Sequence, residues 1–424
     1  MSVIRFPYGK DHFEYNFEGE NLKAVLVSSI EEYTPTASPT DLVEQAVANP
    51  IGSKTLCELA CGKKNIVIIA SDHTRPVPSR VIMPIMLREI RCGNPDADIT
   101  ILIATGCHRG TTKEELIEKF GEEIVENEKI YIHDCLEEEK FAHIGTLPSG
   151  GECIINSIAA NADLLVAEGF IEPHFFAGFS GGRKSVLPGV CSRETVLANH
   201  CSEFIDSPYA RTGILENNPI HTDMLWAAKQ AKLAFIVNVV LDSKKEVIYA
   251  VAGDFEAAHK KGTDFLKELC GAKAHPADIV ISTNSGYPLD RNIYQAVKGM
   301  TAAEATVKQG GVIIMLARSD DGTGGDHFYK RMALSDSLEK AMDMFLSRSR
   351  DETEPDQWMS QILVRILLKA TVIFVSEADE KIVRDMKMIP AHSLVEALTK
   401  AKEILGNPSP EIVAIPDGVS VVVR

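Results

Sequence analysis

The sequence predicts an α/β protein with two lobes, each a mainly parallel sheet flanked by helices. Short apolar runs alternate with amphipathic segments along the chain, which is typical of parallel strands connected by helices. At 424 residues the chain is long enough for two or three domains of about 150 residues each. Its 45% hydrophobic content is sufficient for full cores.

The order of apolar and amphipathic segments predicts the individual elements. Strands are expected at 65–71, 99–105, 163–168, 233–242, 278–283, 311–317, 371–376 and 411–415. Helices are expected at 79–92, 112–120, 192–199, 219–231, 255–270, 292–307, 335–346, 357–370 and 394–405. The turn-rich stretch GAKAHP after residue 270 is the best domain boundary, so we expect one domain at 1–270 and a second at 277–424.

A glycine-rich loop, EPHFFAGFSGGRKS, is the most unusual feature of the sequence. Gly178, Gly181 and Gly182 allow positive φ and a close approach of the main chain to another group, which we expect to be a ligand. The run GFSGGRKS comes within one residue of a phosphate-binding loop, but Arg183 occupies a position that must be glycine. A nucleotide-phosphate loop is therefore disfavoured. A solvated turn with Lys184 on the surface is the simpler alternative.

Three histidines follow predicted strands. His73 comes after the strand at 65–71, His108 after the run ending at Ile103, and His174 after the strand at 163–168. Ligands of open parallel sheets collect outside the carboxyl ends of the strands, so these loops can converge on one site.

Most of the remaining histidines have simpler interpretations. His200 ends a helical segment, so it is either a site residue or a partner of the helix dipole. Structural roles are expected for His12, His133, His143, His259, His275, His327 and His392.

A polar group opens the predicted helix at 292–307. Tyr294, Gln295 and Lys298 fall within one helical turn and would lie on neighbouring faces. They either bind a ligand or form the exposed side of an ordinary amphipathic helix. Trp358 either closes a pocket or belongs to the core.

Charge and cysteine content narrow the function classes. A net charge of −16 disfavours a nucleic-acid groove or an anionic membrane surface. Nine cysteines without a C-x-x-C motif indicate reduced cytosolic thiols. No leader-like amino terminus and no run of about 18 apolar residues is present, so we expect an unprocessed cytoplasmic protein.

Several segments together resemble a known family, the nickel-pincer nucleotide-dependent lactate racemases. They are SDHTRPVPS at 71–79, ATGCHRG at 104–110, EGFIEPHFFAGFSGGRKSVLPG at 168–189, ANH at 198–200, GYPLDRNIYQAVKGM at 286–300 and IPDG at 415–418. The resemblance spans most of the chain and is more specific than any single motif.

The resemblance implies a cofactor, a nickel(II) pyridinium-3,5-bisthiocarboxylate mononucleotide. In the family, the lysine that matches Lys184 carries this group through a thioamide, and the histidine that matches His200 completes a planar nickel site. One protein imidazole is then enough, because the organic ligand supplies the other donors. The loop at 71–79 supplies further expected cofactor-binding residues: Asp72, His73, Thr74 and Arg75.

The resemblance also implies a reaction. His108 and His174 match the two acid/base histidines of a lactate racemase, in which hydride leaves Cα and returns through a pyruvate intermediate. Gln295 and Lys298, with Tyr294, are implied to bind the substrate, enclosed in a cleft between the lobes. Lactate and cofactor-biosynthesis enzymes are the expected partners.

Two alternatives remain open from the sequence. The first is a racemase or epimerase of another 2-hydroxy acid. The second is a non-catalytic protein that carries a nucleotide or cofactor on Lys184 and His200, for which His108 and His174 would have no purpose.

Overall fold

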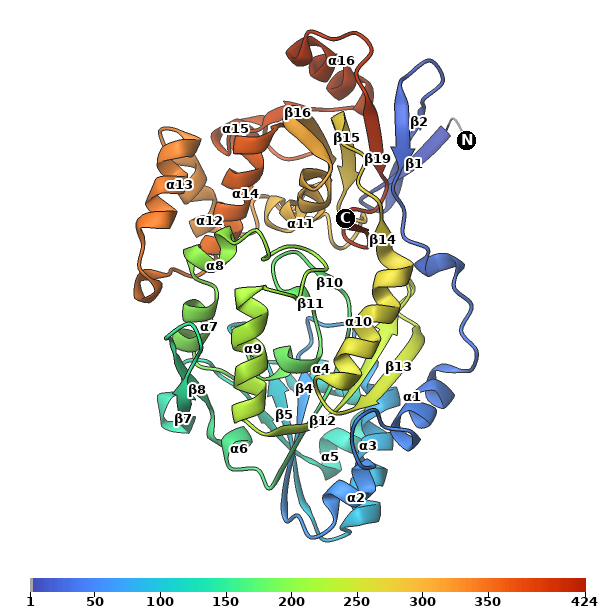
Figure 1. The fold of residues 1–424 in the computed structure, drawn as a ribbon, viewed down its shortest axis with the longest axis vertical. Coiled ribbons are helices and arrows are strands. Elements are labelled where there is room, and N and C mark those ends of the chain that lie inside the picture. Colours follow the sequence, from blue (N-terminus) through green and yellow to red (C-terminus); the bar gives the residue numbers. More distant parts are fainter. Residues whose placement is uncertain (1–2) are drawn as a thin grey trace. The chain divides into compact units, whose positions relative to one another are not determined.

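The computed structural model describes residues 3–424 and separates into two compact units (Figure 1). Unit 1 contains the chain up to Ser29, residues 201–213 and residues 270–424. Unit 2 contains residues 30–200 and 214–269. One division between the units falls at Cys270, and two earlier segments of the chain belong to unit 1 together with the carboxyl-terminal residues.

Strand pairing and helix packing explain this division. Strand β3 (Leu22–Val25) pairs in parallel with β19 (Ile412–Ile415), so the amino-terminal segment completes a sheet formed mostly by the carboxyl-terminal half. Helix α8 (Ser202–Asp206) packs on α14 (Gln357–Lys369), and Gln361 Nε2 donates to the carbonyl of Ser202 at 2.9 Å. Both segments are short and contain few apolar residues, so the sequence does not predict that β3 pairs with β19 or that α8 packs on α14.

Unit 2 is built on a six-stranded sheet in the order β13-β12-β9-β4-β5-β6. All neighbouring strands are parallel except β13, which pairs antiparallel with β12. The strands are β4 (Asn65–Ser71), β5 (Asp98–Ala104), β6 (Lys129–Ile132), β9 (Leu164–Phe170), β12 (Leu233–Leu241) and β13 (Val247–Gly253). Strand β9 is buried along its whole length, as expected for a central strand with helices on both faces.

Helices cover both faces of this sheet. One face packs its alternate residues, including Ile66, Ile68 and Ile101, against apolar side chains of α1 to α5. Helix α9 contacts β12 and lies in front of the sheet in Figure 1. The helices are α1 (Pro39–Ala48), α2 (Leu56–Ala60), α3 (Ser79–Gly93), α4 (Lys113–Phe120), α5 (Glu122–Asn127), α6 (Ser157–Ala160), α7 (Arg193–Asn199), α9 (Pro219–Gln230) and α10 (Ala257–Cys270).

Short elements complete unit 2. They are the hairpin of β7 (Phe141–Thr146) and β8 (Glu152–Asn156), the pair β10 (Pro173–His174) and β11 (Gly178–Phe179), and the 3₁₀ turns η1 (Ile30–Glu32), η2 (Glu138–Lys140) and η3 (Gly182–Ser185).

Unit 1 contains a second six-stranded sheet, in the order β18-β17-β16-β15-β19-β3, and every pairing in it is parallel. Its other strands are β15 (Ala277–Thr283), β16 (Val307–Leu316), β17 (Thr371–Val375) and β18 (Ile389–Ala391). Helix α16 (Leu394–Leu405) packs on one face together with Phe6 and Phe17 near the amino terminus. Helices α11 (Ile293–Glu304) and α14 also contact the sheet.

The remaining elements of unit 1 are short. They are the hairpin of β1 (Val3–Tyr8) and β2 (Asp11–Asn16), the pair β14 (Gly271–Ala272) and β20 (Val422–Val423), α12 (Asp326–Ala333), α13 (Leu338–Ser347), α15 (Glu380–Asp385) and the 3₁₀ turn η4 (Arg350–Glu352).

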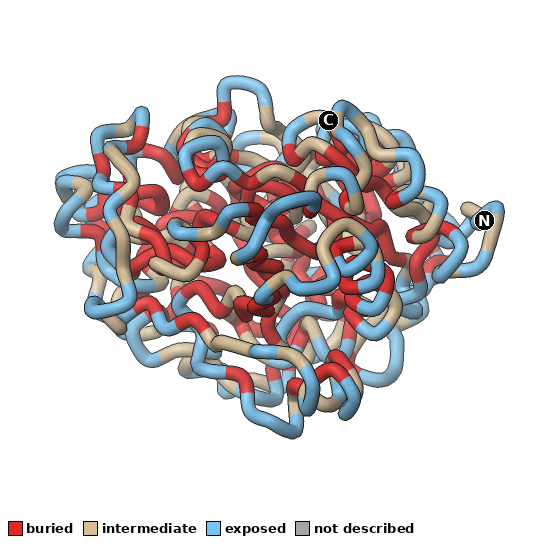
Figure 2. Tube along the Cα trace, turned by 90° about the horizontal axis from the view of Figure 1, so that it is seen from below, coloured by how far each residue is buried: buried red, intermediate tan, exposed pale blue. Residues whose placement is uncertain are grey.

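The predicted fold class, two α/β lobes with mainly parallel sheets, is confirmed, and each predicted strand and helix is present within a few residues. The predicted helix at 292–307 ends at Glu304, because β16 begins at Val307. The two antiparallel hairpins were not predicted, since many of their residues are exposed or only half-buried. Figure 2 shows the buried segments in red, surrounded by exposed turns.

All nine cysteines are free thiols. Among residues 3–424 we find no helix with the length and apolarity needed to cross a membrane.

Candidate active site

The three histidine-bearing loops lie at one edge of the unit 2 sheet. Strands β9, β4 and β5 are neighbours and run parallel, so their carboxyl ends lie side by side. Asp72 directly follows β4, His108 lies in the turn after β5, and His174 lies just beyond β9. The sequence predicted this convergence from the strand assignments alone.

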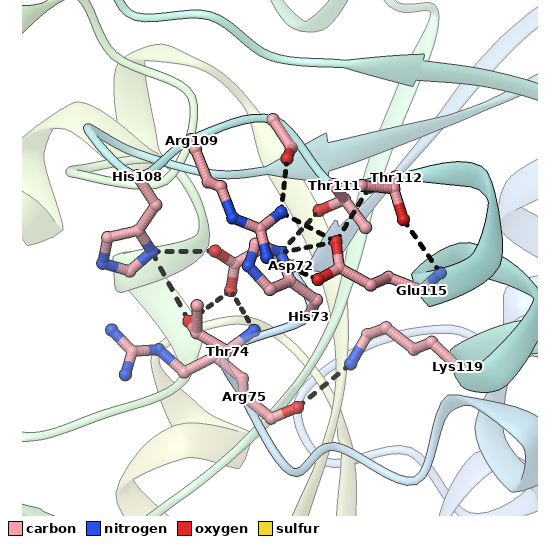
Figure 3. Close-up of polar contacts among 11 residues, drawn as sticks. Asp72, His73, Thr74, Arg75, His108, Arg109, Thr111, Thr112, Glu115 and Lys119 are labelled. Carbon is pink, nitrogen blue, oxygen red and sulfur yellow. Dashed lines mark hydrogen bonds and ion pairs between the residues drawn. The ribbon is translucent and has the colours of Figure 1, made fainter.

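Asp72 and His108 form a hydrogen-bonded pair across two of these loops (Figure 3). Nδ1 of His108 lies 2.7 Å from Oδ2 of Asp72, and the Thr74 hydroxyl donates to Oδ1 of Asp72 at 2.7 Å. Asp72 is 1% exposed. Burial alone would raise the pKa of this carboxyl, but the hydrogen bonds from His108 and Thr74 outweigh it, and the net shift is downward.

This pair fixes the tautomer of His108. An ionised carboxylate can only accept hydrogen bonds, so Nδ1 of His108 carries a proton and donates it to Asp72. When the imidazole is neutral, its Nε2 atom therefore presents a lone pair. The side chain of His108 is 44% exposed, so this atom can reach a substrate. A carboxylate that orients an imidazole in this way is a recurring arrangement for a general base.

A clamp of polar side chains supports the His108 loop. The Arg109 guanidinium binds both carboxylate oxygens of Glu115, at 2.9 and 2.5 Å. Glu115 also accepts from the backbone N–H of Thr112 at 2.8 Å and so closes the capping box of α4. Arg109 is the main reason that the pKa of Glu115 falls to about 2. The loop is therefore attached to the first turn of a helix.

The loop at 72–75 is held by neighbouring side chains. Nδ1 of His73 lies 3.0 Å from the hydroxyl of Thr111, and Lys119 Nζ donates to the carbonyl of Arg75 at 3.2 Å. The Arg75 side chain is exposed and extends toward the side of the cluster occupied by His108 (Figure 3). Its charge contributes to the lowered pKa of Asp72.

A second cluster gathers around the ring of Phe176. The His174 and Phe176 ring centroids are 4.5 Å apart, and those of Phe176 and His200 are 5.1 Å apart. Lys184 Nζ lies 5.7 Å from the centre of the same ring. The structure thus brings together the three predicted residues His174, Lys184 and His200, and Phe176 is the shared neighbour that the sequence did not single out.

His174 has the opposite tautomer to His108. The backbone N–H of Ala177 donates to Nδ1 of His174 at 3.2 Å, so this nitrogen is an acceptor. In the neutral imidazole the proton is then on Nε2. In their neutral forms, His108 therefore presents a hydrogen-bond acceptor at Nε2 and His174 a hydrogen-bond donor.

His200 is a buried, neutral imidazole. It follows the last residue of α7, and its backbone N–H donates to the carbonyl of Val196 at 3.0 Å. Burial, and then the charge of Lys184, lower its pKa to about 3. A partner for the helix dipole would need to be charged, so the dipole interpretation is not supported. A neutral imidazole is the form that binds metals.

Other parts of the protein pack against the glycines of the loop at 172–185. Our expectation that a ligand lies against the backbone at these glycines is therefore corrected. All three have positive φ, as predicted. A Cβ on Gly178 would lie 2.3 Å from the carbonyl oxygen of Ile214, and one on Gly182 would lie 2.8 Å from the ring of His259. The Gly182 N–H donates to Oδ1 of Asn238 at 2.7 Å. The loop is therefore packed against its own unit and is not a nucleotide-phosphate loop.

The predicted substrate-binding residues form a third group, in unit 1. Asn292 caps helix α11 by accepting from the N–H of Gln295 at 3.0 Å. The Tyr294 hydroxyl donates to Asp356 Oδ1 at 2.8 Å, and burial followed by Asp356 raises the pKa of Tyr294. Gln295 and Lys298 are half-buried and one turn apart on α11.

Trp358, near the start of α14, is also half-buried, and its hydrogen bond to Tyr294 tends to lower the pKa of that residue. It is therefore linked to the third group rather than being part of a fully buried core.

No group of three or more His, Cys, Asp or Glu side chains within residues 3–424 is arranged to hold a metal ion.

Together these features define a two-unit α/β protein with two histidines in opposite tautomers, one of them oriented by a carboxylate, and a lysine beside a buried imidazole. The solved structure of the lactate racemase apoprotein from Thermoanaerobacterium thermosaccharolyticum has a TM-score of 0.96 to this chain, with 56% identity and full coverage of both chains. A Thermotoga maritima structure, 19% identical, shares the fold with a TM-score of 0.65 and covers 92% of this chain and 100% of its own.

Sequence comparisons agree. Residues 8–213 match the lactate racemase N-terminal domain, and residues 272–423 match the lactate racemase C-terminal domain. The lactate racemases of Thermoanaerobacterium thermosaccharolyticum and Lactiplantibacillus plantarum are 56% and 54% identical over 425 residues, which covers 100% of this chain and of each relative. The chain belongs to the lactate racemase family.

Proposed function

We propose that this protein is an isomerase that interconverts the L and D enantiomers of lactate. Family membership over the full length supports this activity. The observation that carries it is the pair of histidines in opposite tautomers, His108 oriented by Asp72 and His174 by the Ala177 N–H. Racemisation requires a proton to leave and return at the substrate hydroxyl; neutral His108 is suited to take it, and His174 is suited to donate a hydrogen bond to the same oxygen.

The two imidazoles are proposed to have different roles at the substrate oxygen. Nε2 of neutral His108 is suited to take the hydroxyl proton of the 2-hydroxy acid. Nε2 of neutral His174 carries a hydrogen and is suited to donate a hydrogen bond to the same substrate oxygen. The imidazolium formed on His108 can return its proton to the keto oxygen, so this transfer runs in both directions and no imidazolate is formed. The pKa of Asp72 is lowered, so its carboxylate keeps its charge and favours the imidazolium form of His108.

The residues present fit a nickel-based cofactor of the kind this family uses. His200 is neutral and buried, as a metal ligand must be, and the Lys184 amine lies beside the same Phe176 ring. We propose that Lys184 carries a nickel-pincer nucleotide covalently and that His200 binds its nickel. When bound, this group would accept the Cα hydrogen as hydride, which avoids an unstabilised carbanion.

The strand-end loop after β4 is proposed to bind the nucleotide portion. Arg75 is exposed and suits a phosphate, and His73 and Thr74 offer polar atoms in the same loop. Both carboxylate oxygens of Asp72 are already engaged by Thr74 and His108. We therefore assign Asp72 to the orientation of His108 rather than to the cofactor.

Substrate binding is proposed for helix α11. Gln295 and Lys298 supply an amide and an ammonium group within one helical turn, which suits a carboxylate. The Tyr294 hydroxyl is already committed to Asp356, so Tyr294 would contribute its ring to the binding surface and keep this end of α11 in place.

The cellular setting is also part of the proposal. The cofactor would have to be supplied by separate biosynthetic enzymes, which we propose as partners of the protein. We propose a cytoplasmic location, in keeping with nine free thiols.

A racemase of another 2-hydroxy acid is the second candidate, because the same tautomer pair and carboxylate-binding residues would serve any small substrate of this class. A panel of 2-hydroxy acids distinguishes the two. A simple cofactor carrier is disfavoured, because it would not need the Asp72–His108 pair.

Enantiopure L-lactate labelled with deuterium at C2 provides the test. The nickel-loaded protein should convert it to a racemic mixture, followed by chiral chromatography, and the D product should retain the deuterium. Absence of conversion by a fully loaded protein would overturn the proposed activity. Loss of the label to solvent would instead leave a racemase that works by proton abstraction.

A further inference from the structure

The side chain next to the proposed cofactor lysine is unusual. Arg183 precedes Lys184 in the turn η3 and is only 1% exposed, the largest fully buried side chain within residues 3–424. It makes no ion pair with a carboxylate in that part of the chain, and burial lowers its pKa to about 9. A buried cation of this kind persists only if other groups satisfy it well.

Backbone carbonyls of the preceding loop accept hydrogen bonds from the Arg183 guanidinium. Arg183 Nη2 donates to the carbonyl of Ala177 at 2.8 Å. Its Nη1 donates to the carbonyl of Phe179 at 2.8 Å and to that of Gly181 at 3.2 Å. The planar guanidinium therefore ties together three peptide groups of the loop that leads to Lys184.

These peptide groups lie between the two proposed functional side chains. His174 is at one end of the segment and Lys184 is at the other, and the N–H that fixes the tautomer of His174 belongs to Ala177, whose carbonyl Arg183 holds. A neighbouring side chain, Asn218, holds the carbonyl of Phe176 at 2.8 Å. Two buried polar side chains therefore fix the path of the segment together with the short β10–β11 pair.

One histidine accepts a hydrogen bond from Arg183, and a second lies beside it and donates from Nε2 to the carbonyl of Ser180 at 2.8 Å. Arg183 Nε donates to Nδ1 of His221 at 3.0 Å, and its Nη1 lies 3.1 Å from Nε2 of His259. Burial, and then the charge of Arg183, lower the pKa of both histidines, that of His221 to about 3. Both are therefore uncharged near neutral pH, and His221 can accept the Arg183 hydrogen bond.

We propose that Arg183 is a positioning residue, which places the Lys184 amine and the tautomer-fixed His174 for the reaction proposed above. Successive residues of a 3₁₀ turn point in different directions, so the burial of Arg183 determines the side on which Lys184 emerges, toward Phe176. Lysine could not replace Arg183, because an ammonium group on a flexible stem does not present the same planar fork. This inference rests on the proposed function only where kcat is measured; the position of the Lys184 amine can be tested without it.

The main test uses the apoprotein and needs no turnover. Lys184 is acetylated in competition with the exposed Lys64 by limiting acetic anhydride, and the two peptides are quantified by mass spectrometry. Arg183→Lys and Arg183→Gln should change the Lys184 to Lys64 labelling ratio by about threefold or more, because the local opening of the loop alters the exposure of the amine. After loading with the cofactor, kcat should fall about 10- to 100-fold through the misplaced groups, with a smaller effect on KM.

A milder pair of variants covers the case in which Arg183 variants do not fold. His221→Asn retains an acceptor close to the position of Nδ1, whereas His221→Leu removes it. We expect His221→Asn to resemble the wild type in labelling and kcat and His221→Leu to shift toward the Arg183 variants. If His221 only filled space, His221→Asn would not restore the labelling ratio and kcat that His221→Leu loses.

The control is Met86→Ala in helix α3, which removes a buried side chain away from the loop and should lower the melting temperature without changing the labelling ratio. An unchanged labelling ratio in a folded Arg183→Gln or His221→Leu protein would overturn the proposal. So would an equal change in Met86→Ala, since the effect would then be general destabilisation. Failure of the wild type to racemise lactate, with the labelling result intact, would count against the proposed function and not against this inference.

Discussion

Asp72 and His108 meet across the loops of two adjacent strands, with Oδ2 of the carboxylate 2.7 Å from Nδ1 of the imidazole. The Asp72 carboxylate is buried and the His108 imidazole is half-exposed, so Asp72 is held in place while His108 is accessible to a ligand. Because β4 and β5 are paired in register from Asn65 with Asp98 to Ser71 with Ala104, the distance between the two loops is set by the sheet.

Asp72→Asn should lower kcat by about 100-fold or more, because an amide can donate to Nδ1 of His108 and so stabilise the wrong tautomer. The metal content of the loaded protein should stay the same, since Asp72 is assigned no contact with the cofactor. Steady-state kinetics and metal analysis on one preparation check both statements. Thr74→Val, which removes the other Asp72 hydrogen bond, is the matched control and should cost about 10-fold or less. Loss of nickel in Asp72→Asn would return Asp72 to the cofactor site.

Lys184→Ala and His200→Ala should separate the two proposed attachments of the cofactor. Lys184→Ala should show no added covalent mass after loading. His200→Ala should retain the mass excess on the Lys184 peptide but lose most of its nickel, because the protein ligand is gone. Intact-mass and metal measurements read these properties independently. A wild-type protein that binds nickel without a mass change at Lys184 would contradict the covalent link.

Lys298→Met and Gln295→Leu should each raise KM for lactate by about 10-fold or more, since each removes a proposed hydrogen bond to a carboxylate. The mass at Lys184 should not change. Tyr294→Phe offers a contrast on the same helix: it loses the bond to Asp356 and should reduce the free energy of unfolding by about 1 kcal/mol, with a smaller effect on KM. Unaltered KM in both Lys298→Met and Gln295→Leu would remove helix α11 from the substrate site.

The buried histidines His221 and His259 predict an acid-sensitive fold. Unfolded imidazoles bind protons below pH 6.5, whereas burial and the Arg183 charge keep the folded pKa of His221 near 3 and also lower that of His259. The unfolded state then binds more protons, so stability is fully present above pH 6.5 and falls as the pH drops from 6.5 toward 3. Each such histidine contributes a slope of about 1.4 kcal/mol per pH unit in this window.

Urea unfolding at a series of pH values measures this slope. His221→Asn should reduce it by the contribution of one proton. A slope unaffected by His221→Asn would show that this imidazole is already protonated in the folded state or does not titrate in this range.

Much of unit 2 could be predicted because its signals are local. The runs at 65–71 and 99–105 are apolar throughout and end in polar loops, so the strands and the position of Asp72 and His108 at their carboxyl ends follow from the pattern. The side-chain pairing of Asp72 with His108 did not follow, because it depends on the direction of two side chains 36 positions apart in the chain.

The glycine-rich loop shows why other features could not be predicted. Positive φ at Gly178, Gly181 and Gly182 follows from residue type, but what fills the space beside each one is a tertiary contact. Arg183 was noted in the sequence only as an obstacle to a phosphate-binding loop. Its partners at His221 and His259 are 38 and 76 positions away, and no local pattern connects them to it.

The path of the chain between units bears on how the protein is made. All strands of the unit 2 sheet have been synthesised by Gly253, so that sheet can assemble while the rest of the chain is still being translated. Strand β3, made at the outset, must wait for β19, almost 400 positions later, before it has a neighbour. Until then its edge is exposed, and a ribosome that stalls between the two would present an unpaired strand to chaperones and to other nascent chains.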